Sequence, residues 1–320
     1  MGHSTRQAVR ASGPGSPDVG VHVDVAITGS TGLVGEALVA SLAARGHSVR
    51  RLVRRAAGPG EVRWDPQGGT IDAAALAGID ACVHLAGEGI AEHKWSEAQK
   101  QRILESRTRG TDLVARTLAA LDSRPSVLVS ASAIGYYGDR GDEELVETTA
   151  PGDDFLARVC VAWEAATAPA ADAGIRVVPA RSGIILDAHG GALSRMLLPF
   201  KLGLGGRLGS GRQYMSWISL DDEVGGIVHA LEHPDVVGPM NLTAPTPVTN
   251  AEFTATLGRV LRRPTLLPTP LLPLRLRYGA ELIQHLLLDS ARVLPAALER
   301  SGYTFVHQEL EAALRHAIAR

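Results

Sequence analysis

A glycine-rich segment near the start of this 320-residue chain constrains its fold more than any other feature. Gly29, Gly32 and Gly35 directly follow an apolar run over 22–28, and a stretch with helical spacing begins at residue 34. Glycines at this spacing let the backbone approach a pyrophosphate closely, and the N-terminus of the following helix favours its negative charge. The segment predicts the strand, turn and helix that open a Rossmann-type dinucleotide-binding domain. The alternative is a tight turn that only packs well.

Short apolar runs recur through the first half of the chain. They lie near 23–28, 49–53, 81–85, 127–130 and 175–179, and longer stretches of helical period separate them. Strands that alternate with helices are typical of βαβ units. The pattern therefore predicts an α/β fold with a Rossmann-type, doubly wound parallel sheet.

The rhythm of strands and helices becomes irregular beyond residue 180, and this change predicts the domain organisation. We expect a disordered tail over 1–22 and a dinucleotide-binding Rossmann domain over 23–180, with a return segment near 217–243. A smaller C-terminal substrate lobe is then formed by 181–216 and 244–320.

Composition and charge limit the partners. A formal net charge of −2 lacks the excess of basic residues that nucleic acids require. The apolar stretch over 266–288 is interrupted by prolines and charged residues, so it is a poor membrane span. Cys82 and Cys160 have no metal-ligand spacing and indicate neither a disulfide nor a zinc site. We expect a cytoplasmic monomer or homodimer that takes a small-molecule substrate, without nucleic acid, membrane or metal.

The second predicted strand ends in two arginines, which bear on the choice of dinucleotide. NAD enzymes carry an acidic residue about twenty residues beyond the glycines, whereas an arginine there suits the 2′-phosphate of NADP. Arg54 and Arg55 occupy this place, so NADP is preferred to NAD, unless both arginines are ordinary solvated surface. Asp65 ends a further strand over 62–65 and would either accept from the adenine amino group or cap a turn.

Further motifs are spread over most of the chain. They are Leu85–Glu88, Ser106–Arg107, Ser130–Gly138, Arg181–Gly183, Gly203–Gly206, Gly209–Gln213, and the C-terminal segments 301–305 and 310–314. Together with the glycine segment they resemble the extended short-chain dehydrogenase/reductase superfamily, and within it the atypical branch of "epimerase family" proteins. The resemblance implies a Rossmann fold and bound NADP. It also implies that the turn at Ala86 and Gly87 passes beneath the cofactor and that Arg107 lies near its phosphate or the substrate.

The candidate ligand-binding residues follow from these patterns. Those predicted to bind the cofactor are Gly29, Ser30, Thr31, Gly32, Leu33, Val34, Gly35, Arg54, Arg55, Asp65, Leu85, Ala86, Gly87, Glu88 and Arg107. Arg212 and Gln213 follow a glycine-dense segment over 203–211 that is typical of a loop close to a ligand. These two residues are predicted to hold an anionic substrate group, the alternative being a solvated loop.

The expected catalytic pair is missing. Enzymes of the superfamily use a tyrosine as acid or base and a lysine four residues later, which lowers the pKa of the phenol. None of the five tyrosines has a lysine at that spacing. The helix expected to carry the pair, over 154–164, has Leu156 and Cys160 in the corresponding positions.

Three interpretations remain. In the first, an NADP-dependent oxidoreductase or epimerase-like enzyme acts on a carbonyl, carbinol or sugar-nucleotide-like substrate, and Ser132, Tyr136 or Tyr137 supplies the acid/base group. In the second, the chain is an NADP-binding regulator or scaffold without turnover. In the third, it is a purely structural module, which the intact glycines and the arginines of the second strand argue against.

Overall fold

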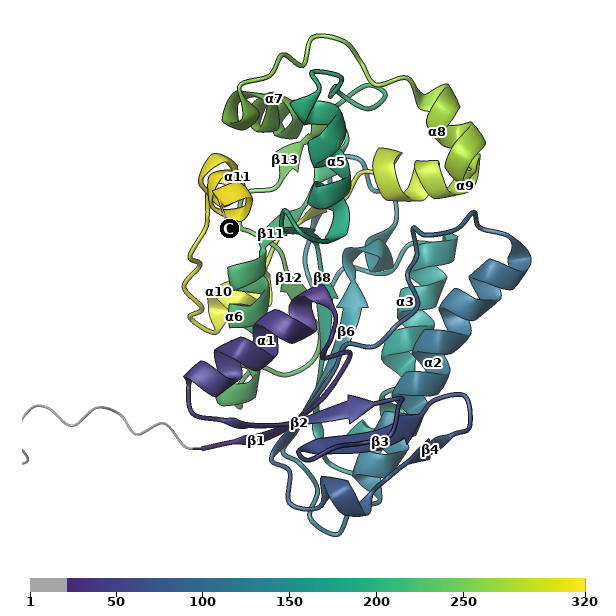
Figure 1. Cartoon of the computed structure of the whole chain (residues 1–320), viewed down its shortest axis with the longest axis vertical. Helices are drawn as coiled ribbons and strands as arrows, with labels where there is room; N and C mark the ends of the chain where they lie inside the picture. The colour runs from purple at the N-terminus through teal and green to yellow at the C-terminus, as the bar shows by residue number, and fades with distance from the viewer. Residues whose placement is uncertain (1–21, 320) are drawn as a thin grey trace, which may run out of the picture.

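The computed structural model describes residues 22–319, so residues 1–21 of the predicted tail lie outside the described part. An eight-stranded sheet fills the lower part of the molecule (Figure 1), with the strand order β12-β8-β6-β5-β1-β2-β3-β4. Its strands are β1 (Asp24–Thr28), β2 (Ser48–Val53), β3 (Glu61–Asp65), β4 (Thr70–Ile71), β5 (Ala81–His84), β6 (Val127–Ala133), β8 (Arg176–Ser182) and β12 (Met240–Leu242). Neighbours in this order run parallel except β3 and β4. The predicted Rossmann-type sheet is confirmed.

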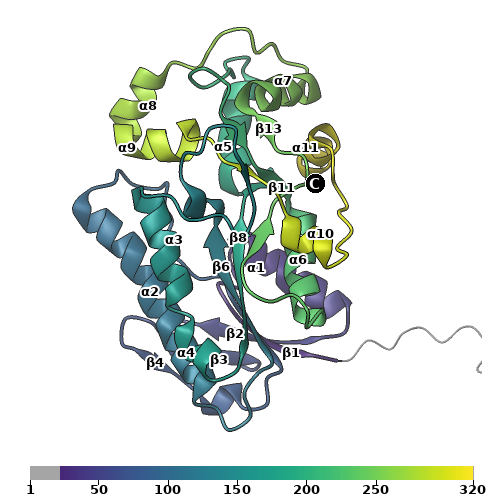
Figure 2. The ribbon, with the colours of Figure 1, turned by 180° about the vertical axis from the view of Figure 1, so that it is seen from behind.

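Helices cover both faces of the sheet (Figures 1 and 2). One face carries α1 (Leu33–Ala44) and α6 (Leu220–Glu232), and the other carries α2 (Glu97–Ala119), α3 (Phe155–Ala165) and α4 (Ala168–Asp172). Successive strand residues point to opposite faces. Ile27 therefore packs in the core under α1, whereas its neighbour Ala26 packs in the core under α2. This two-sided burial is what makes the strands nearly continuous runs of apolar residues.

Two central strands extend further than their apolar runs predict. β6 continues to Ala133 and β8 continues to Ser182, instead of ending near residues 130 and 179. Ser132 pairs in register with Arg181, so inter-strand pairing keeps these polar residues extended although their local sequence is not strand-like. Arg181 and Ser182 therefore belong to the large sheet, although the predicted boundary put them at the start of the smaller lobe.

The upper part of the molecule is built from short elements (Figure 1). They are β7 (Glu144–Leu145), β9 (Ile184–Leu186), α5 (Gly191–Lys201), β10 (Tyr214–Met215), β11 (Trp217–Ser219), β13 (Val248–Thr249), α7 (Asn250–Leu261), α8 (Leu271–Tyr278), α9 (Ala280–Ile283), a π-helical turn (Gln284–Leu288), β14 (Arg292–Val293) and α11 (Leu310–Ala319). The short helix α10 (Ala296–Arg300) lies beside α6 and packs on the core of the large sheet through Leu298. Leu193, Trp217, Phe253 and Leu314 belong to its separate apolar core. Within residues 22–319, no helix is long and apolar enough to cross a membrane.

Candidate functional site

Two glycines of the turn between β1 and α1 are required by close packing. Gly29 has φ of 69°, and a Cβ atom there would lie 2.9 Å from the backbone nitrogen of Ala86. A Cβ atom on Gly35 would lie 2.2 Å from the carbonyl oxygen of Gly29, which no structure tolerates. Gly32 differs, because it is exposed and its Cβ atom would meet only the same oxygen, at 3.4 Å. Gly29 and Gly35 hold the turn tight, and Gly32 presents backbone to solvent.

The N-terminus of α1 is open to an anion. Gly32 is the N-cap residue, and no side chain caps the first turn. The backbone N–H groups at an uncapped helix start point outward along the positive end of the helix dipole. Leu33, Val34 and Gly35 contribute these groups, while Ser30 is buried and Thr31 is exposed beside them. The arrangement fits the pyrophosphate of a dinucleotide.

A buried hydrogen-bond cluster ties the end of β1 to the end of β5. The Thr28 hydroxyl oxygen accepts hydrogen bonds from the backbone N–H groups of Leu85, at 3.1 Å, and Ala86, at 3.2 Å. The Nδ1 atom of fully buried His84 lies 2.7 Å from the same oxygen. Because this oxygen already accepts two amide protons, the hydroxyl donates its own proton to Nδ1, and His84 is neutral. The cluster positions exposed Gly87 at the carboxyl edge of the sheet.

The burial of His84 makes stability depend on pH. Burial lowers the pKa of His84 from 6.5 to about 4. In the unfolded chain His84 is therefore protonated below about pH 6.5, whereas in the native chain it stays neutral until the pH falls to about 4. We expect this group alone to reduce the free energy of unfolding by about 3 kcal/mol as the pH falls across that window, with no contribution above it. Urea unfolding at a series of pH values measures the slope.

The matched control for that slope is His84→Gln, which removes the titrating group and retains polar atoms. The variant is expected to show a shallower dependence of the free energy of unfolding on pH between about 4 and 6.5. Equal slopes for the two proteins would contradict the assignment.

Arg107 lies against the turn that follows β5. Its Nη1 atom donates to the carbonyl oxygens of Glu88, at 3.0 Å, and Ile103, at 3.2 Å, and its guanidinium lies 4.9 Å from the centre of the Trp163 ring. The backbone N–H of Glu88 donates to the Ser106 hydroxyl at 3.2 Å. The structure thus brings the two motifs at 85–88 and 106–107 together, with Arg107 bracing the turn from below.

The two arginines after β2 have different surroundings. Arg55 makes two hydrogen bonds to the Glu61 carboxylate, of 2.6 and 2.5 Å, which raise its pKa. Arg54 is exposed and makes no ion pair with any described residue. The Asp65 carboxylate accepts from the backbone N–H groups of Gln67 and Gly68, each at 3.0 Å, as in the turn-capping alternative. Arg54 is therefore better placed than Arg55 to meet an external phosphate.

Ser132, at the carboxyl end of β6, is held by a buried ion pair. Its hydroxyl donates to Oε1 of Glu164 on α3 at 2.7 Å. Arg181 on β8 is 2% exposed, and its guanidinium donates two hydrogen bonds of 2.8 Å to the same carboxylate. An Arg–carboxylate pair of this bidentate form fixes both side chains. Ser132 therefore has a defined orientation at the strand end.

The two tyrosines that follow β6 are not equivalent. Tyr137 is fully buried, donates its phenolic proton to Oδ1 of Asn241 at 2.7 Å, and accepts from Nη1 of Arg181 at 3.0 Å. Burial raises the pKa of Tyr137 to about 12, so its phenol stays protonated at neutral pH. Tyr136 is half-buried, with its ring centre 3.5 Å from the guanidinium carbon of Arg181. Tyr136 is the tyrosine still available to an external group.

Glu164, Arg181 and Asn241 are residues of this site that the sequence did not predict as functional. Glu164 and Asn241 are single polar side chains among apolar neighbours on α3 and β12, and Arg181 opens one of the motifs that carry the family resemblance. Their partners lie on other elements, so spacing along the chain does not reveal them. Together they fix Ser132, on β6, and Tyr137, in the turn that follows β6.

Apolar side chains occupy the expected relay positions on α3. A Cβ atom on Gly135 would lie 3.3 Å from Cβ of Leu156 and 4.0 Å from Sγ of Cys160, so both side chains adjoin the end of β6. Burial raises the pKa of Cys160 to about 12, so the thiol is not a nucleophile at neutral pH. Neither side chain can replace the missing tyrosine or lysine.

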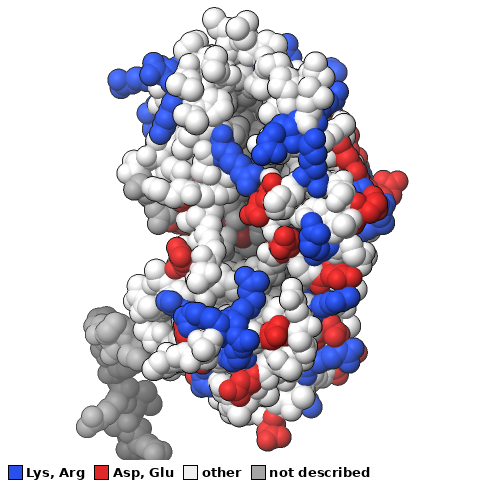
Figure 3. Space-filling view, turned by 45° about the vertical axis from the view of Figure 1, so that its right-hand side comes forward, with Lys and Arg blue, Asp and Glu red and all other residues white. Residues whose placement is uncertain are grey.

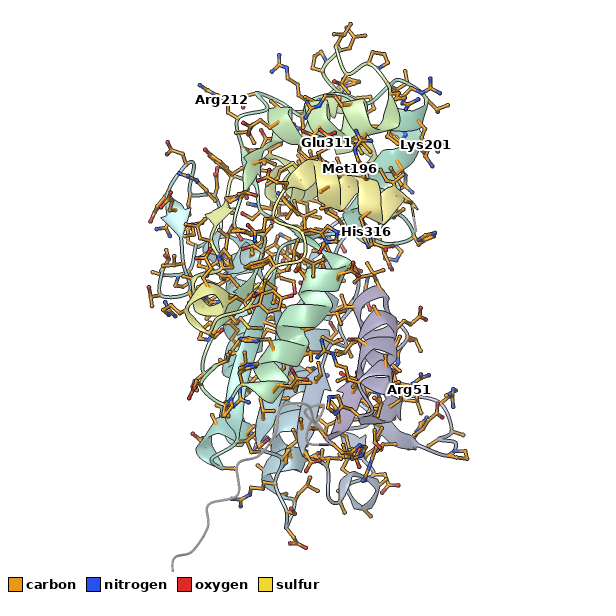
Figure 4. All side chains as sticks on the ribbon, turned by 90° about the vertical axis from the view of Figure 1, so that its left-hand side faces the viewer. Arg51, Met196, Lys201, Arg212, Glu311 and His316 are labelled. Atoms are coloured by element: carbon orange, nitrogen blue, oxygen red, sulfur yellow. The ribbon has the colours of Figure 1, made fainter. Side chains whose placement is uncertain are left out.

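The two predicted substrate-binding residues have separate roles. Gln213 is buried, and its Nε2 atom donates to the carbonyl oxygens of Leu208, at 3.1 Å, and Leu287, at 3.0 Å. Arg212 is exposed and lies at the upper end of the molecule, far above Arg51 of β2 (Figure 4). Gln213 braces the loop from within, whereas the Arg212 side chain is exposed, so the two residues face different surroundings. Figure 3 shows the surface hollowed between the upper and lower parts, with side chains of both charges around it.

Fold and turn together define a protein of the Rossmann-type α/β class. The chain belongs to the NAD-dependent epimerase/dehydratase family, whose profile matches residues 25–242. Residues 269–317 match a domain of unknown function, DUF1731. The resemblance inferred from the motifs is confirmed.

The chain is similar over its length to several members of this family. An epimerase family protein of Mycobacterium bovis is 48% identical over 297 residues, which cover 92% of this chain and 98% of the relative. Human epimerase family protein SDR39U1 is 38% identical over 298 residues, covering 92% of this chain and 99% of the relative. A crystal structure of its isoform 2 with NADPH superposes with a TM-score of 0.85 and 38% identity, covering 92% of this chain and 99% of that one.

Proposed function

We propose that this chain is an NADP-dependent oxidoreductase or epimerase-like enzyme that exchanges hydride with a carbonyl, carbinol or sugar-nucleotide-like substrate. The observation that carries the proposal is the glycine turn, where Gly29 and Gly35 leave no room for side chains and the start of α1 has no side-chain cap. The similar human protein that was crystallised with NADPH supports the choice of cofactor.

Each group of predicted cofactor residues has a task in this proposal. The backbone from Gly32 to Gly35 would bind the pyrophosphate, and Arg54 would pair with the 2′-phosphate of the adenosine ribose. The turn at Gly87, which Arg107 braces, would pass beneath the ribose and pyrophosphate. The predicted residues follow the carboxyl ends of β1, β2 and β5, which is the edge where a Rossmann-type sheet binds its dinucleotide.

The bound cofactor would supply or accept the hydride. Ser132 would accept a hydrogen bond from the hydroxyl of a carbinol substrate, because its own proton goes to Glu164, which is paired with Arg181. Tyr136 would exchange the proton, because the phenolic proton of Tyr137 is committed to Asn241. The Arg181 guanidinium packs against the Tyr136 ring and would hold the phenol in position.

Substrate turnover distinguishes an enzyme from an NADP-binding regulator or scaffold. Purified protein with NADPH is incubated with a panel of carbonyl compounds and sugar nucleotides while nicotinamide absorbance is followed. We expect oxidation of NADPH with at least one substrate class and its loss in Tyr136→Phe, whereas Tyr137→Phe retains activity. Tight NADPH binding without turnover across the panel would contradict the enzymatic proposal.

The alternative is an NADP-binding regulator or scaffold. The specific observation in its favour is that Leu156 and Cys160 place apolar side chains where a proton relay is expected. A regulator would change its partner binding with the redox state of the cofactor. Hydrogen exchange of the surface around the glycine turn, compared between NADP⁺ and NADPH, measures such a change.

The preference for NADP is expected to depend on Arg54. In Arg54→Asp, the affinity for NADPH should fall about 10- to 100-fold while the affinity for NADH is unchanged, because a charge-assisted bond to the 2′-phosphate is replaced by repulsion. Titration of the nicotinamide fluorescence measures both affinities.

The matched control is Arg55→Ala, since Arg55 is committed to Glu61. This variant is expected to keep NADPH affinity within about twofold of the parent, because an exposed ion pair contributes little. An unchanged ratio of NADPH to NADH affinity in Arg54→Asp would overturn the assignment.

A further inference from the structure

Two histidines and an aspartate gather where the C-terminal helix meets the start of α6. Asp221 lies in the first turn of α6, His307 precedes α11, and His316 lies in the last turn of α11. The Nε2 atom of His316 is 2.8 Å from Oδ2 of Asp221, and the two imidazole centres are 4.7 Å apart. One ligand atom from each residue lies within 4.8 Å of the other two. Figure 4 shows His316 at the end of α11 that faces α6.

The hydrogen bonds around His307 prepare one of its ring nitrogens as a ligand. The Ser219 hydroxyl donates to Oδ2 of Asp222 at 2.7 Å, so it has no proton left for the imidazole. His307 Nδ1, 3.3 Å from this hydroxyl oxygen, must therefore be the donor. The neutral tautomer then carries its lone pair on Nε2, the form in which an imidazole binds a metal.

Asp222 acts as the outer support of this arrangement. Its carboxylate lies 3.8 Å from His307 Nδ1 and accepts the backbone N–H groups of Val306, at 2.7 Å, and His307, at 3.0 Å. The side chain of Asp222 is 1% exposed and that of His307 is 11% exposed. The Ser219 hydroxyl links this carboxylate to His307 Nδ1, and a polar group that fixes the far nitrogen of a metal-binding histidine is a recurrent feature of zinc sites. This buried support separates the cluster from an ordinary surface ion pair.

We propose that Asp221, His307 and His316 bind a divalent cation of the Zn²⁺ class. Two imidazoles and one carboxylate match the ligands that Zn²⁺ prefers, and water completes the coordination. A cavity of about 510 Å³ between α1 and α6 is lined in part by Asp221 and provides the ion with a route from solvent.

The site joins segments that are far apart in the sequence, which explains why spacing along the chain predicted no metal. Bound Zn²⁺ holds α11 against the start of α6, and α6 packs in the same core as α1, the helix that begins at the glycine turn. Without the ion, α11 is held chiefly by its apolar face, which includes Leu310 and Leu314. Zinc is therefore expected to stabilise the C-terminal helix.

The test uses the full chain without a histidine tag, freed of metal with a chelator and titrated with ZnCl₂ by calorimetry. We expect one equivalent to bind and the melting temperature to rise. In His316→Ala and Asp221→Asn the zinc affinity should fall at least tenfold. His316 has a half-exposed side chain, so its removal leaves the fold intact. Circular dichroism of the apo variants verifies that they are folded.

Two further variants decide whether the zinc site is this one. His93→Ala removes an exposed histidine outside the cluster and is expected to leave zinc binding unchanged. His285→Ala removes the histidine of a second cluster, which it forms with Asp154 and Asp289. This variant is also expected to bind one equivalent of zinc. Zinc binding that survives His316→Ala and Asp221→Asn, or that is lost in His285→Ala, would overturn the proposal, as would absence of stoichiometric binding.

Discussion

Arg181→Leu is expected to lower the free energy of unfolding by about 3–5 kcal/mol. The leucine leaves the Glu164 carboxylate in the interior without its two guanidinium hydrogen bonds. It also removes the donor to the Tyr137 phenol and the support of the Tyr136 ring. Urea unfolding followed by circular dichroism measures the loss.

Two controls test whether the loss of stability comes from burial of the Arg181–Glu164 ion pair and not from the loss of any ion pair. Arg116→Ala breaks an ion pair with Asp112 whose side chains are 69% and 41% exposed, so it is expected to cost less than about 1 kcal/mol. The double variant Arg181→Leu/Glu164→Leu should recover part of the stability, because no charge is left unpaired in the interior. A loss in Arg181→Leu no larger than in Arg116→Ala would contradict the role given to the pair.

The parts of the fold that the sequence predicted are those specified by neighbouring residues. The strand ending at Thr28, the turn through Gly32 and the following helix lie within one short segment, so local pattern suffices to recognise them. The same holds for the apolar runs of the other central strands. The ends of β6 and β8 were missed because Ser132 and Arg181 are extended by pairing with each other, which no local pattern encodes.

The candidate site shows the same division. The glycine turn of the proposed cofactor site could be located from the sequence because the packing that requires Gly29 and Gly35 lies close to their own position in the chain. The catalytic half could be predicted only in part, because Glu164 and Asn241 decide which hydroxyl groups remain available. The sequence offered no reason to distinguish Tyr136 from Tyr137, because the contact that differs, the hydrogen bond from Tyr137 to Asn241, joins segments far apart in the chain.

Gly35→Ala is expected to abolish NADPH binding, with at least a 100-fold loss of affinity, and to destabilise the fold by several kcal/mol. The new methyl group would lie 2.2 Å from the Gly29 carbonyl oxygen and 2.8 Å from Cα of Ser30, so the turn must open and α1 must move. Such a movement misplaces the N–H groups of the helix start and loosens the packing of α1. Fluorescence titration with NADPH and urea unfolding report the two effects.

Two other glycines test whether the turn acts through packing, through contact with the ligand, or through both. Gly32→Ala meets only one atom, at 3.4 Å, so it should leave the free energy of unfolding nearly unchanged but weaken NADPH binding, since its methyl group lies on the exposed side of the turn. Gly46→Ala, with φ of 82° and open space around it, should cost about 1 kcal/mol through backbone strain and leave NADPH affinity intact. If Gly32→Ala binds NADPH as the parent does, the exposed side of the turn is not the pyrophosphate site, whatever the stability of Gly35→Ala.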